Sequence, residues 1–280
     1  MSAAEFIGRR IAERYDIVAL LGSGGMANVY RCVDIVLERA VALKLLTGEE
    51  DAVRHRFLSE ARSLARLNHA GIVAIHDVGE DVGLSYIVME LAEGKTLREL
   101  ATAGMSTDSA VNLTVQVLEA LAYAHEHDVL HRDLKPSNIL VAPNGSVKIM
   151  DFGLARRISD LSAGTQAGEI AGTVSYLPPE RFLGKPSDAR SDLYSLGIVL
   201  YELLSGAVPF RDASNDLVAE VFAHVNARAL PPTHHNATLN PELERIVLKS
   251  IEKDPRARFQ SASELRDELQ AYLASTADGG

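Results

Sequence analysis

The spacing of hydrophobic and polar residues changes along the chain, and its first part has the two-residue period of β-strands. Between residues 15 and 46 apolar positions alternate with polar ones and are interrupted by turn-forming residues, which is typical of a half-buried sheet. Two later segments have the same strand character. The predicted strands are Tyr15–Leu21, Val29–Asp34, Ala40–Leu46, Ile72–Val78 and Ser85–Glu90.

Helical spacing occupies residues 51–68 and most of the chain beyond residue 94. Ser109–His127 predicts a long helix. Leu193–Leu204 is apolar on almost all sides, with Gly206 beyond it as a C-cap, and such a helix is usually buried in the centre of a lobe. The pattern therefore predicts an α+β fold, in which a small sheet-rich lobe precedes a larger helical lobe with a cleft between them.

Glu60 interrupts the apolar stripe of the first predicted helix. It follows Phe57 by three residues and precedes Leu64 by four, and a carboxylate on a core-facing stripe is costly unless a cation pairs with it. Lys44 is the candidate cation. Alternation places it on the same strand face as Ala42, so we expect Lys44 to reach both Glu60 and phosphates, while Ala42 leaves room for a flat base.

A second group of polar residues lies in His131-Arg-Asp-Leu-Lys-Pro-Ser-Asn138, followed by Asp151-Phe-Gly153. Asp133 is suited to accept a proton from a hydroxyl, and Lys135 to neutralise a migrating phosphoryl group. The alternative is a loop that holds an ordinary salt bridge. The coincidence of so many roles in one string favours the chemical interpretation.

Asn144-Gly145, between two apolar runs, predicts a hairpin with these two residues at the centre of its turn. In that register Asn138 faces Asp151, and directly opposed residues lie roughly 4.5–5.5 Å apart. An amide oxygen and a carboxylate at that spacing suit Mg²⁺ that arrives with phosphates.

Leu21-Gly-Ser-Gly-Gly-Met-Ala-Asn-Val-Tyr30 is a glycine-rich turn that would let backbone amides approach phosphate oxygens. One alternative is a dinucleotide-binding motif, with Glu49 as its acidic residue about 20 positions on. That motif needs a helix after the glycines, whereas Val29–Asp34 has strand character. The other alternative is a purely structural turn.

Composition excludes several classes of protein. The 280 residues include 47% hydrophobic positions, enough for a large core, and the net charge of −10 argues against a nucleic-acid partner. Cys32 is the single cysteine, so no intrachain disulfide forms and a reducing compartment is expected. The sequence contains no apolar run of about 18 residues, so no membrane-spanning helix is predicted. The spacing of the histidines does not suit a zinc site.

Taken together, these motifs resemble those of protein kinases of the eukaryotic type, and most of all their bacterial serine/threonine members, over residues 13–273. The resemblance implies a bilobal protein-kinase fold, α+β, with ATP and Mg²⁺ as cofactors. It implies an N-lobe over 13–91 and a C-lobe over 92–273, with tails at 1–12 and 274–280. The implied function is transfer of the ATP γ-phosphate to protein Ser or Thr hydroxyls.

The family pattern assigns a role to each matching residue. Asp133 becomes the catalytic base, with Lys135 beside it, and Asn138 and Asp151 become the magnesium ligands. Met89 is the gatekeeper residue before the hinge, and Thr173 belongs to the catalytic set. The implied nucleotide-binding residues are Leu21, Gly22, Ser23, Gly24, Gly25, Met26, Ala27, Val29, Ala42, Lys44, Glu60, Met89, Glu90, Leu91, Ala92 and Leu140.

The same resemblance implies two structural pairs, Glu180 with Arg258, and Asp192 with the catalytic loop. Lys135 and Thr173 favour Ser/Thr over Tyr acceptors. Thr165 is the expected autophosphorylation site, whereas Ala167 stands where close relatives often have a second threonine.

The expected partners are protein substrates and, for phosphorylation in trans, a second copy of the chain, with no nucleic acid and no membrane within this chain. The expected location is the cytoplasm, either as a soluble protein or as the catalytic part of a membrane-anchored receptor kinase. The competing functions are a catalytically dead kinase-like scaffold and a small-molecule phosphotransferase. The scaffold would usually lack one of Lys44, Asp133 or Asp151. The phosphotransferase would lack Gly172-Thr173 and Pro178-Pro-Glu180 with the protein-docking segment that they belong to.

Overall fold

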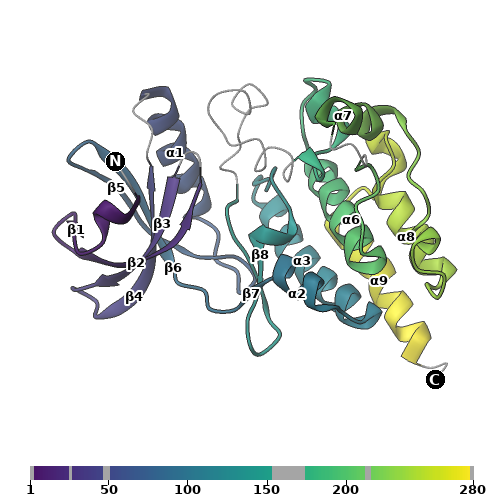
Figure 1. The fold of residues 1–280 in the computed structure, drawn as a ribbon, viewed down its shortest axis with the longest axis horizontal. Coiled ribbons are helices and arrows are strands. Elements are labelled where there is room, and N and C mark those ends of the chain that lie inside the picture. Colours follow the sequence, from purple (N-terminus) through teal and green to yellow (C-terminus); the bar gives the residue numbers. More distant parts are fainter. Residues whose placement is uncertain (1–2, 25–26, 47–50, 153–173, 212–215, 278–280) are drawn as a thin grey trace. The chain divides into compact units, whose positions relative to one another are not determined.

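The computed structural model describes residues 3–24, 27–46, 51–152, 174–211 and 216–277. Within helix α1, the side chain of Glu60 also lies outside the described part. The chain forms two compact units, which divide between Glu93 and Gly94 (Figure 1). Each unit has its own buried core.

The first unit is built on a six-stranded antiparallel sheet with the order β1-β2-β3-β4-β6-β5. The three strands predicted between residues 15 and 46 are confirmed to within two residues at each end. The strands are β1 Arg10–Ile11, β2 Tyr15–Ser23, β3 Ala27–Asp34, β4 Arg39–Leu46, β5 Ile75–Asp81 and β6 Leu84–Glu90, and a 3-10 helix, η1, covers Ala3–Phe6.

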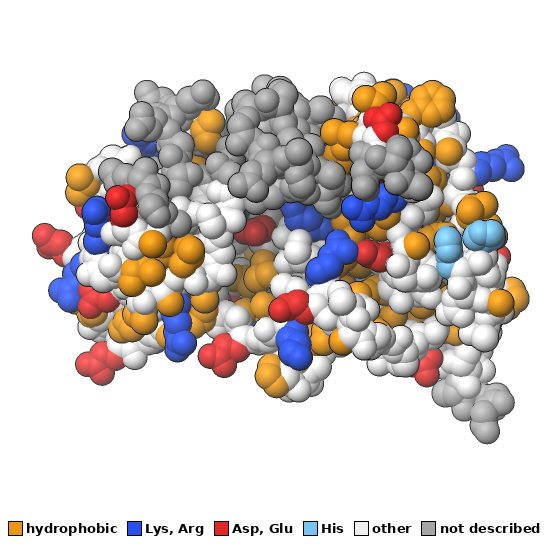
Figure 2. Space-filling model, viewed as in Figure 1, with side chains coloured by type: hydrophobic (Ala, Val, Ile, Leu, Met, Phe, Trp, Pro, Cys, Tyr) orange, Lys and Arg blue, Asp and Glu red, His pale blue; other side chains and the backbone are white. Residues whose placement is uncertain are grey.

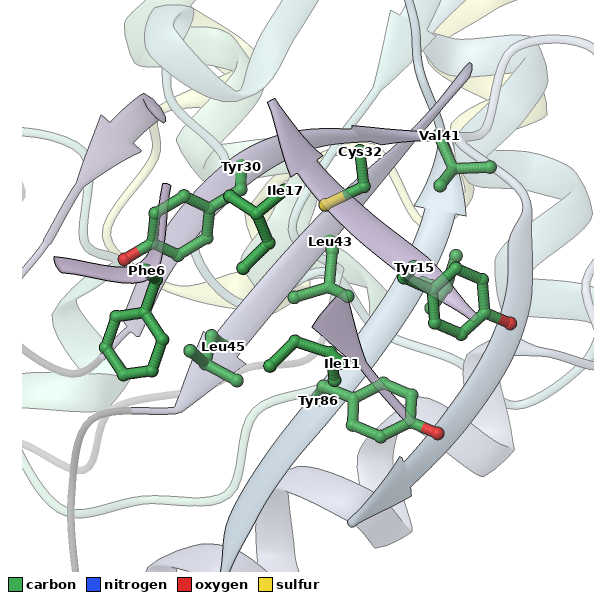
Figure 3. Packing of buried hydrophobic residues seen from close by; sticks show 11 residues of the cluster. Phe6, Ile11, Tyr15, Ile17, Tyr30, Cys32, Val41, Leu43, Leu45 and Tyr86 are labelled. Carbon is green, nitrogen blue, oxygen red and sulfur yellow. The ribbon is translucent and has the colours of Figure 1, made fainter. Parts of the chain in front are cut away.

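Alternate residues of these strands turn one face of the sheet into a core (Figure 3). On β4, for example, Val41, Leu43 and Leu45 are all fully buried. Tyr15 and Tyr86 pack against each other in the same cluster, with ring centroids 6.0 Å apart. Residues of opposite faces alternate along a strand, so the intervening positions of β4 lie on the other face of the sheet, away from this core.

Helix α1 covers Asp51–Leu64 and packs against β5 and β6. Its apolar stripe is real, since Phe57 and Ala61 are buried. The prediction that a strand begins at Ile72 is wrong, because the strand begins at Ile75. A turn precedes it instead, closed by a hydrogen bond from the Ile72 N–H to the His69 carbonyl.

The second unit is mainly helical (Figure 1), and α6 lies at its centre in contact with α3, α8 and α9. Its helices are α2 Leu97–Ala103, α3 Thr107–Glu126, α5 Pro179–Phe182, α6 Ala189–Ser205, α7 Leu217–Asn226, α8 Pro241–Ser250 and α9 Ala262–Ala277, with 3-10 helices η2 Pro136–Asn138, η4 Pro232–His234 and η5 Pro255–Ala257.

The prediction of a buried central helix is confirmed in α6. Twelve of its residues are buried, and Gly206 caps its end with a φ of 76°, a conformation that glycine adopts at little cost. Gly197 lets α8 approach closely, because a Cβ at this position would lie 2.7 Å from the Cβ of Ser250. Close packing of α6 thus depends on a glycine inside the helix.

The predicted hairpin belongs to a small three-stranded sheet, β7-β8-β9, and its observed register differs from the predicted one. Its strands are β7 Lys95–Thr96, β8 Ile139–Val141 and β9 Val147–Ile149. The turn contains three residues, Pro143, Asn144 and Gly145, because the Ala142 N–H donates to the Ser146 carbonyl and Gly145 has a φ of 81°. This is the three-residue hairpin loop with a left-handed last residue.

The consequence is a shift of one residue in the pairing. Ile139 pairs with Ile149, and the Met150 N–H donates to the Asn138 carbonyl. Asn138 therefore lies opposite Met150, and the expectation that it lies opposite Asp151 is wrong. Asp151 is the next residue, and its φ of 57° turns the chain away from the strand direction.

Acidic and basic side chains are interspersed with apolar ones on the face drawn in Figure 2. On helix α7, the apolar side chains of Val218 and Phe222 are exposed. Within the described residues, no helix combines the length and the apolar character needed to cross a membrane.

Candidate active site

In the second unit, the loop between α3 and η2 brings Asp133, Lys135 and Asn138 together. The Lys135 ammonium lies 3.0 Å from Asp133 Oδ2. The Asn138 side-chain nitrogen donates to the Asp133 carbonyl at 2.8 Å and to Asp133 Oδ2 at 3.3 Å. Both of these bonds use the nitrogen, so the amide oxygen is the atom that Asn138 can offer to a cation.

Asp192, near the start of α6, holds the backbone of this loop. Its carboxylate accepts the N–H groups of His131 and Arg132, each at 2.8 Å. Arg132 has a φ of 64°, a strained conformation for a residue with a Cβ. The predicted link between Asp192 and the loop is therefore confirmed, and it stabilises the strained residue next to Asp133.

His125 on α3 gives Asp192 a third partner. Its Nε2 lies 2.9 Å from Asp192 Oδ2, and Asp192 is almost completely buried. Burial raises the pKa of Asp192, but the hydrogen bonds and charges of its neighbours, His125 first among them and the Arg132 N–H included, together outweigh burial and leave that pKa below its usual value. A buried carboxylate thus stays charged where backbone donors need it.

The His131 ring connects the loop to the segment that carries Asp151. Nδ1 accepts the Asp133 N–H at 3.3 Å, and Nε2 donates to the Met150 carbonyl at 2.9 Å. These partners require the tautomer with its proton on Nε2. The ring also packs on Phe152, with centroids 4.7 Å apart. The backbone of Asp133 and the two residues that flank Asp151 therefore all contact one buried ring.

Among the described residues, no three His, Cys, Asp or Glu side chains come close enough to form a metal site of their own. The nearby histidines have other partners, for example His127, whose ring bonds to the Tyr123 carbonyl. One carboxylate and one amide, Asp151 and Asn138, suit Mg²⁺ that keeps waters and phosphate oxygens as its other ligands.

In the first unit, the glycine-rich segment joins β2 to β3. Leu21, Gly22, Ser23 and Gly24 are exposed, and the Gly24 N–H donates to the Ala27 carbonyl. Gly25 and Met26 lie outside the described residues. Strand β3 follows the glycines directly, which excludes the dinucleotide-binding alternative because that motif requires a helix there.

Strand register places several predicted nucleotide-binding residues on one face of the first sheet. Val29 pairs with Lys44, and Ala42 pairs with Met89. Directly paired residues share a face, as do residues two apart on one strand, so all four side chains lie on the same face. Ala42 is buried within it. The expected Lys44–Glu60 ion pair lies outside the described residues.

The remaining predicted nucleotide-binding residues lie on strands β6 and β8 or directly after β6. Glu90 ends β6, and its carboxylate accepts the Ala74 N–H at 3.3 Å. Leu91 and Ala92 come directly after it and are partly buried. In the second unit, Leu140 lies on β8 and is 8% exposed.

The segment after residue 173 is anchored by a buried ion pair. Both guanidinium nitrogens of Arg258 lie 2.9 Å from the Glu180 carboxylate, which confirms the predicted pair. Burial raises the pKa of Glu180, but the hydrogen bonds and charge of Arg258 outweigh burial and lower it overall. Thr173 and Thr165 lie outside the described residues.

The sequence did not indicate the contacts of three residues, Tyr176, His125 and Gln116. Tyr176 bonds both Arg98 on α2 and Glu202 on α6. His125 contacts Asp192 beneath the loop. The side chain of Gln116, on α3, contacts the β8–β9 hairpin. No local signal marks these residues, because their partners are separated from them by 26 to 78 positions in sequence.

Known proteins match this chain along most of its length. The model of the protein kinase domain family matches residues 15–269. A probable serine/threonine-protein kinase of Streptomyces coelicolor is 43% identical over 95% of this chain and 41% of its own length. The serine/threonine-protein kinase PrkC of Bacillus subtilis is 40% identical over 94% of this chain and 41% of its own length.

Among solved structures, the PknI kinase domain of Mycobacterium tuberculosis superimposes with a TM-score of 0.74 at 26% identity, covering 95% of this chain and 98% of that one. The chain spans about two fifths of the length of the curated relatives it matches. The family model covers nearly the whole sequence, and the expectations of a kinase fold and of an enzyme are confirmed. The chain belongs to the protein kinase family and is similar throughout to bacterial serine/threonine-protein kinases.

Proposed function

We propose that this chain transfers the γ-phosphate of ATP to Ser and Thr hydroxyls of proteins. The observation that carries the proposal is the arrangement around Asp133, whose carboxylate lies beside both the Lys135 ammonium and the Asn138 amide. Asp192 holds the same loop from inside the unit. Preorganised charges of this kind supply most of the acceleration in phosphoryl transfer.

In the proposed reaction the substrate hydroxyl oxygen bonds to the γ-phosphorus as the bond to the β-phosphate oxygen breaks. ADP leaves, and the hydroxyl proton passes to Asp133. Lys135 offsets the charge of the transferring group. The lysine lies 3.0 Å from the base, so one small region can serve both tasks.

Asn138 and Asp151 would hold the Mg²⁺, which neutralises phosphate charge when bound. The donor set fits, because the Asn138 nitrogen is occupied by Asp133 and its oxygen can therefore serve the cation. Met150, just before Asp151, is fixed by bonds to both Asn138 and His131. We assign the nucleotide to Leu21–Ala27, the sheet face of Ala42 and Lys44, Glu60, and the segment Met89–Ala92.

A direct test is to incubate the purified chain with γ-labelled ATP, Mg²⁺ and a mixture of Ser-, Thr- and Tyr-containing acceptor peptides. We expect label on Ser and Thr only. Transfer to Tyr alone, or to a small-molecule alcohol but no peptide, would contradict the proposal.

Lys44→Met should lower kcat/KM for ATP by about 10²–10³-fold, because one preorganised cation at the phosphates is lost. Lys44 lies on the same sheet face as Ala42. Arg39→Met is the matched control, since Arg39 is an exposed cation on the same strand. Equal activity in the two variants would show that the nucleotide binds elsewhere.

Autophosphorylation at Thr165 is the regulatory part of the proposal. We expect mass spectrometry to find phosphate on Thr165 after incubation with ATP and Mg²⁺. Two guanidinium groups suit a group of about two negative charges: Arg132, and Arg156, which follows Asp151-Phe-Gly153 in sequence and lies outside the described residues. Arg132 is exposed and lies beside the base in sequence. After phosphatase treatment, Thr165→Ala should no longer regain activity with ATP, whereas the wild type should. Full recovery by the variant would remove Thr165 from regulation.

We further propose protein substrates, action in the cytoplasm and a transient pair of copies for phosphorylation in trans. Mixing an inactive variant with active enzyme tests the last point. Label on the inactive copy supports reaction between molecules, and label on the active copy alone indicates reaction within one.

A further inference from the structure

Gln116 connects helix α3 to the hairpin of β8 and β9. Its side-chain oxygen accepts the Val147 N–H at 3.1 Å, and its side-chain nitrogen donates to the Gly145 carbonyl at 3.2 Å. Both polar atoms of one amide are therefore used by two residues on either side of Ser146. Helix α3 also packs against β9 directly.

β9 is the edge strand of the small sheet, so the backbone groups on its outer side find no partner strand. Two backbone hydrogen bonds close the hairpin at its ends: the Ala142 N–H donates to the Ser146 carbonyl, and the Met150 N–H donates to the Asn138 carbonyl. They show which backbone groups on the β9 side point toward β8. Val147 belongs to the pair with Val141 that lies between hydrogen-bonded pairs, so its N–H points outward. The Gln116 side-chain oxygen accepts a hydrogen bond from this outward Val147 N–H, and it thereby fixes the residue at which β9 begins.

The position of this start matters because the hairpin has a competing register. Asn144-Gly145 also suits a two-residue turn, which would shift the pairing by one residue. Such a slip would move the buried Val147 and Ile149 to the face of Leu140. It would also move Asp151 by about 3.4 Å along the strand, from its observed place to one directly opposite Asn138, and so change the spacing of these two side chains from the observed one.

We infer that Gln116 is a positioning residue that holds the β8–β9 register and thereby the spacing of Asn138 and Asp151. The inference rests on the proposed function, in which these two residues bind Mg²⁺. Gln116 does not touch the metal in this scheme. It acts through the hairpin, as residues behind a metal ligand commonly do.

The test compares Gln116→Leu with wild type and with Asn112→Leu. Leucine keeps the size of glutamine but removes both hydrogen bonds. Asn112 lies one turn earlier on α3, and its amide nitrogen donates to the Asp108 carbonyl within the same helix. Gln116→Glu is a second variant, which retains the acceptor for Val147 but presents an oxygen to the Gly145 carbonyl.

Two readouts are needed. Hydrogen exchange of the Val147 and Met150 amides in metal-free protein reports on the two ends of β9, since Val147 donates to Gln116 and Met150 to Asn138. The Mg²⁺ concentration for half-maximal transfer, at saturating ATP, reports on the ligands. In Gln116→Leu we expect both amides to exchange at least about tenfold faster and the Mg²⁺ requirement to rise about tenfold, with KM for the acceptor peptide unchanged.

Asn112→Leu should match wild type in both readouts. Gln116→Glu should keep Val147 protected and show a Mg²⁺ requirement between wild type and Gln116→Leu. Should Gln116→Leu fail to fold, a shifted requirement in folded Gln116→Glu supports the inference and an unshifted one overturns it.

Unchanged Met150 exchange with an unchanged Mg²⁺ requirement in folded Gln116→Leu overturns the inference, even if Val147 exchanges faster, because Gln116 would then only cover the sheet edge. Absence of Mg²⁺-dependent transfer in wild type would instead count against the proposed function. The exchange data on metal-free protein would still decide whether Gln116 holds the register.

Discussion

Asp133→Asn should lower kcat by about 10²–10⁴-fold, the usual contribution of a general base, while KM for ATP stays nearly constant. The amide has the shape of the carboxylate but cannot take up the hydroxyl proton. Its neighbours Lys135 and Asn138 lie at 3.0 and 3.3 Å from one Asp133 oxygen, and an amide oxygen can still accept from both. The loss should therefore appear in the chemical step, as measured by single-turnover transfer to a Ser peptide.

Asp128→Asn is the matched control for this variant. Asp128 is exposed, lies in the same connection and has a φ of 60°, which asparagine tolerates well. It loses the same charge a few residues away and should keep wild-type kcat. A value of kcat for Asp133→Asn within threefold of wild type would remove Asp133 from its proposed role.

Arg258→Leu should lower the free energy of unfolding of the second unit by about 3–5 kcal/mol, because it leaves the Glu180 carboxylate buried without its cation. Glu180 is 5% exposed and Arg258 2% exposed. Arg258 also donates to the carbonyls of Glu252, Lys253 and Arg190, so the variant unpairs several buried groups at once. Denaturant unfolding followed by a probe in the second unit measures the change.

Two further variants separate the charge from the packing. Glu180→Gln combined with Arg258→Leu removes the unpaired charge, so the double variant should be more stable than Arg258→Leu alone. Arg256→Leu breaks the exposed pair with Asp254 and should change the free energy of unfolding by less than about 1 kcal/mol. If Arg258→Leu behaved like Arg256→Leu, the buried pair would contribute little to stability.

Local pattern predicted local structure well where one sheet face is buried and the other is not. The alternation in β4 locates Val41, Leu43 and Leu45 in the core and Ala42 and Lys44 on the other face. The burial of the apolar helix capped by Gly206 was predicted equally well, because a fully buried helix needs no polar face. The chemistry of the loop was readable for a similar reason, since Asp133, Lys135 and Asn138 are close in sequence and must be close in space.

The register of the β8–β9 hairpin was not predicted correctly from the sequence. Asn144-Gly145 favours a turn but does not choose between two- and three-residue loops, and the predicted opposition of Asn138 and Asp151 was wrong by one residue. The choice depends on which face of β9 is buried and on the partners of its outer edge. One such partner, Gln116, lies on helix α3, 31 positions before Val147 in the sequence.

The sequence by itself determined the family, the order of strands and helices, and the identity of the polar groups in the catalytic loop. The family follows from the resemblance of its motifs. Short-range spacing suffices for the elements and the loop, because backbone geometry fixes which neighbours share a face. Only the tertiary structure decided how these groups are held: His125 and Asp192 beneath the loop, Arg258 beside Glu180, and the hairpin register. Such contacts form where distant segments pack, and their partners are selected by burial and hydrogen bonding that no local pattern encodes.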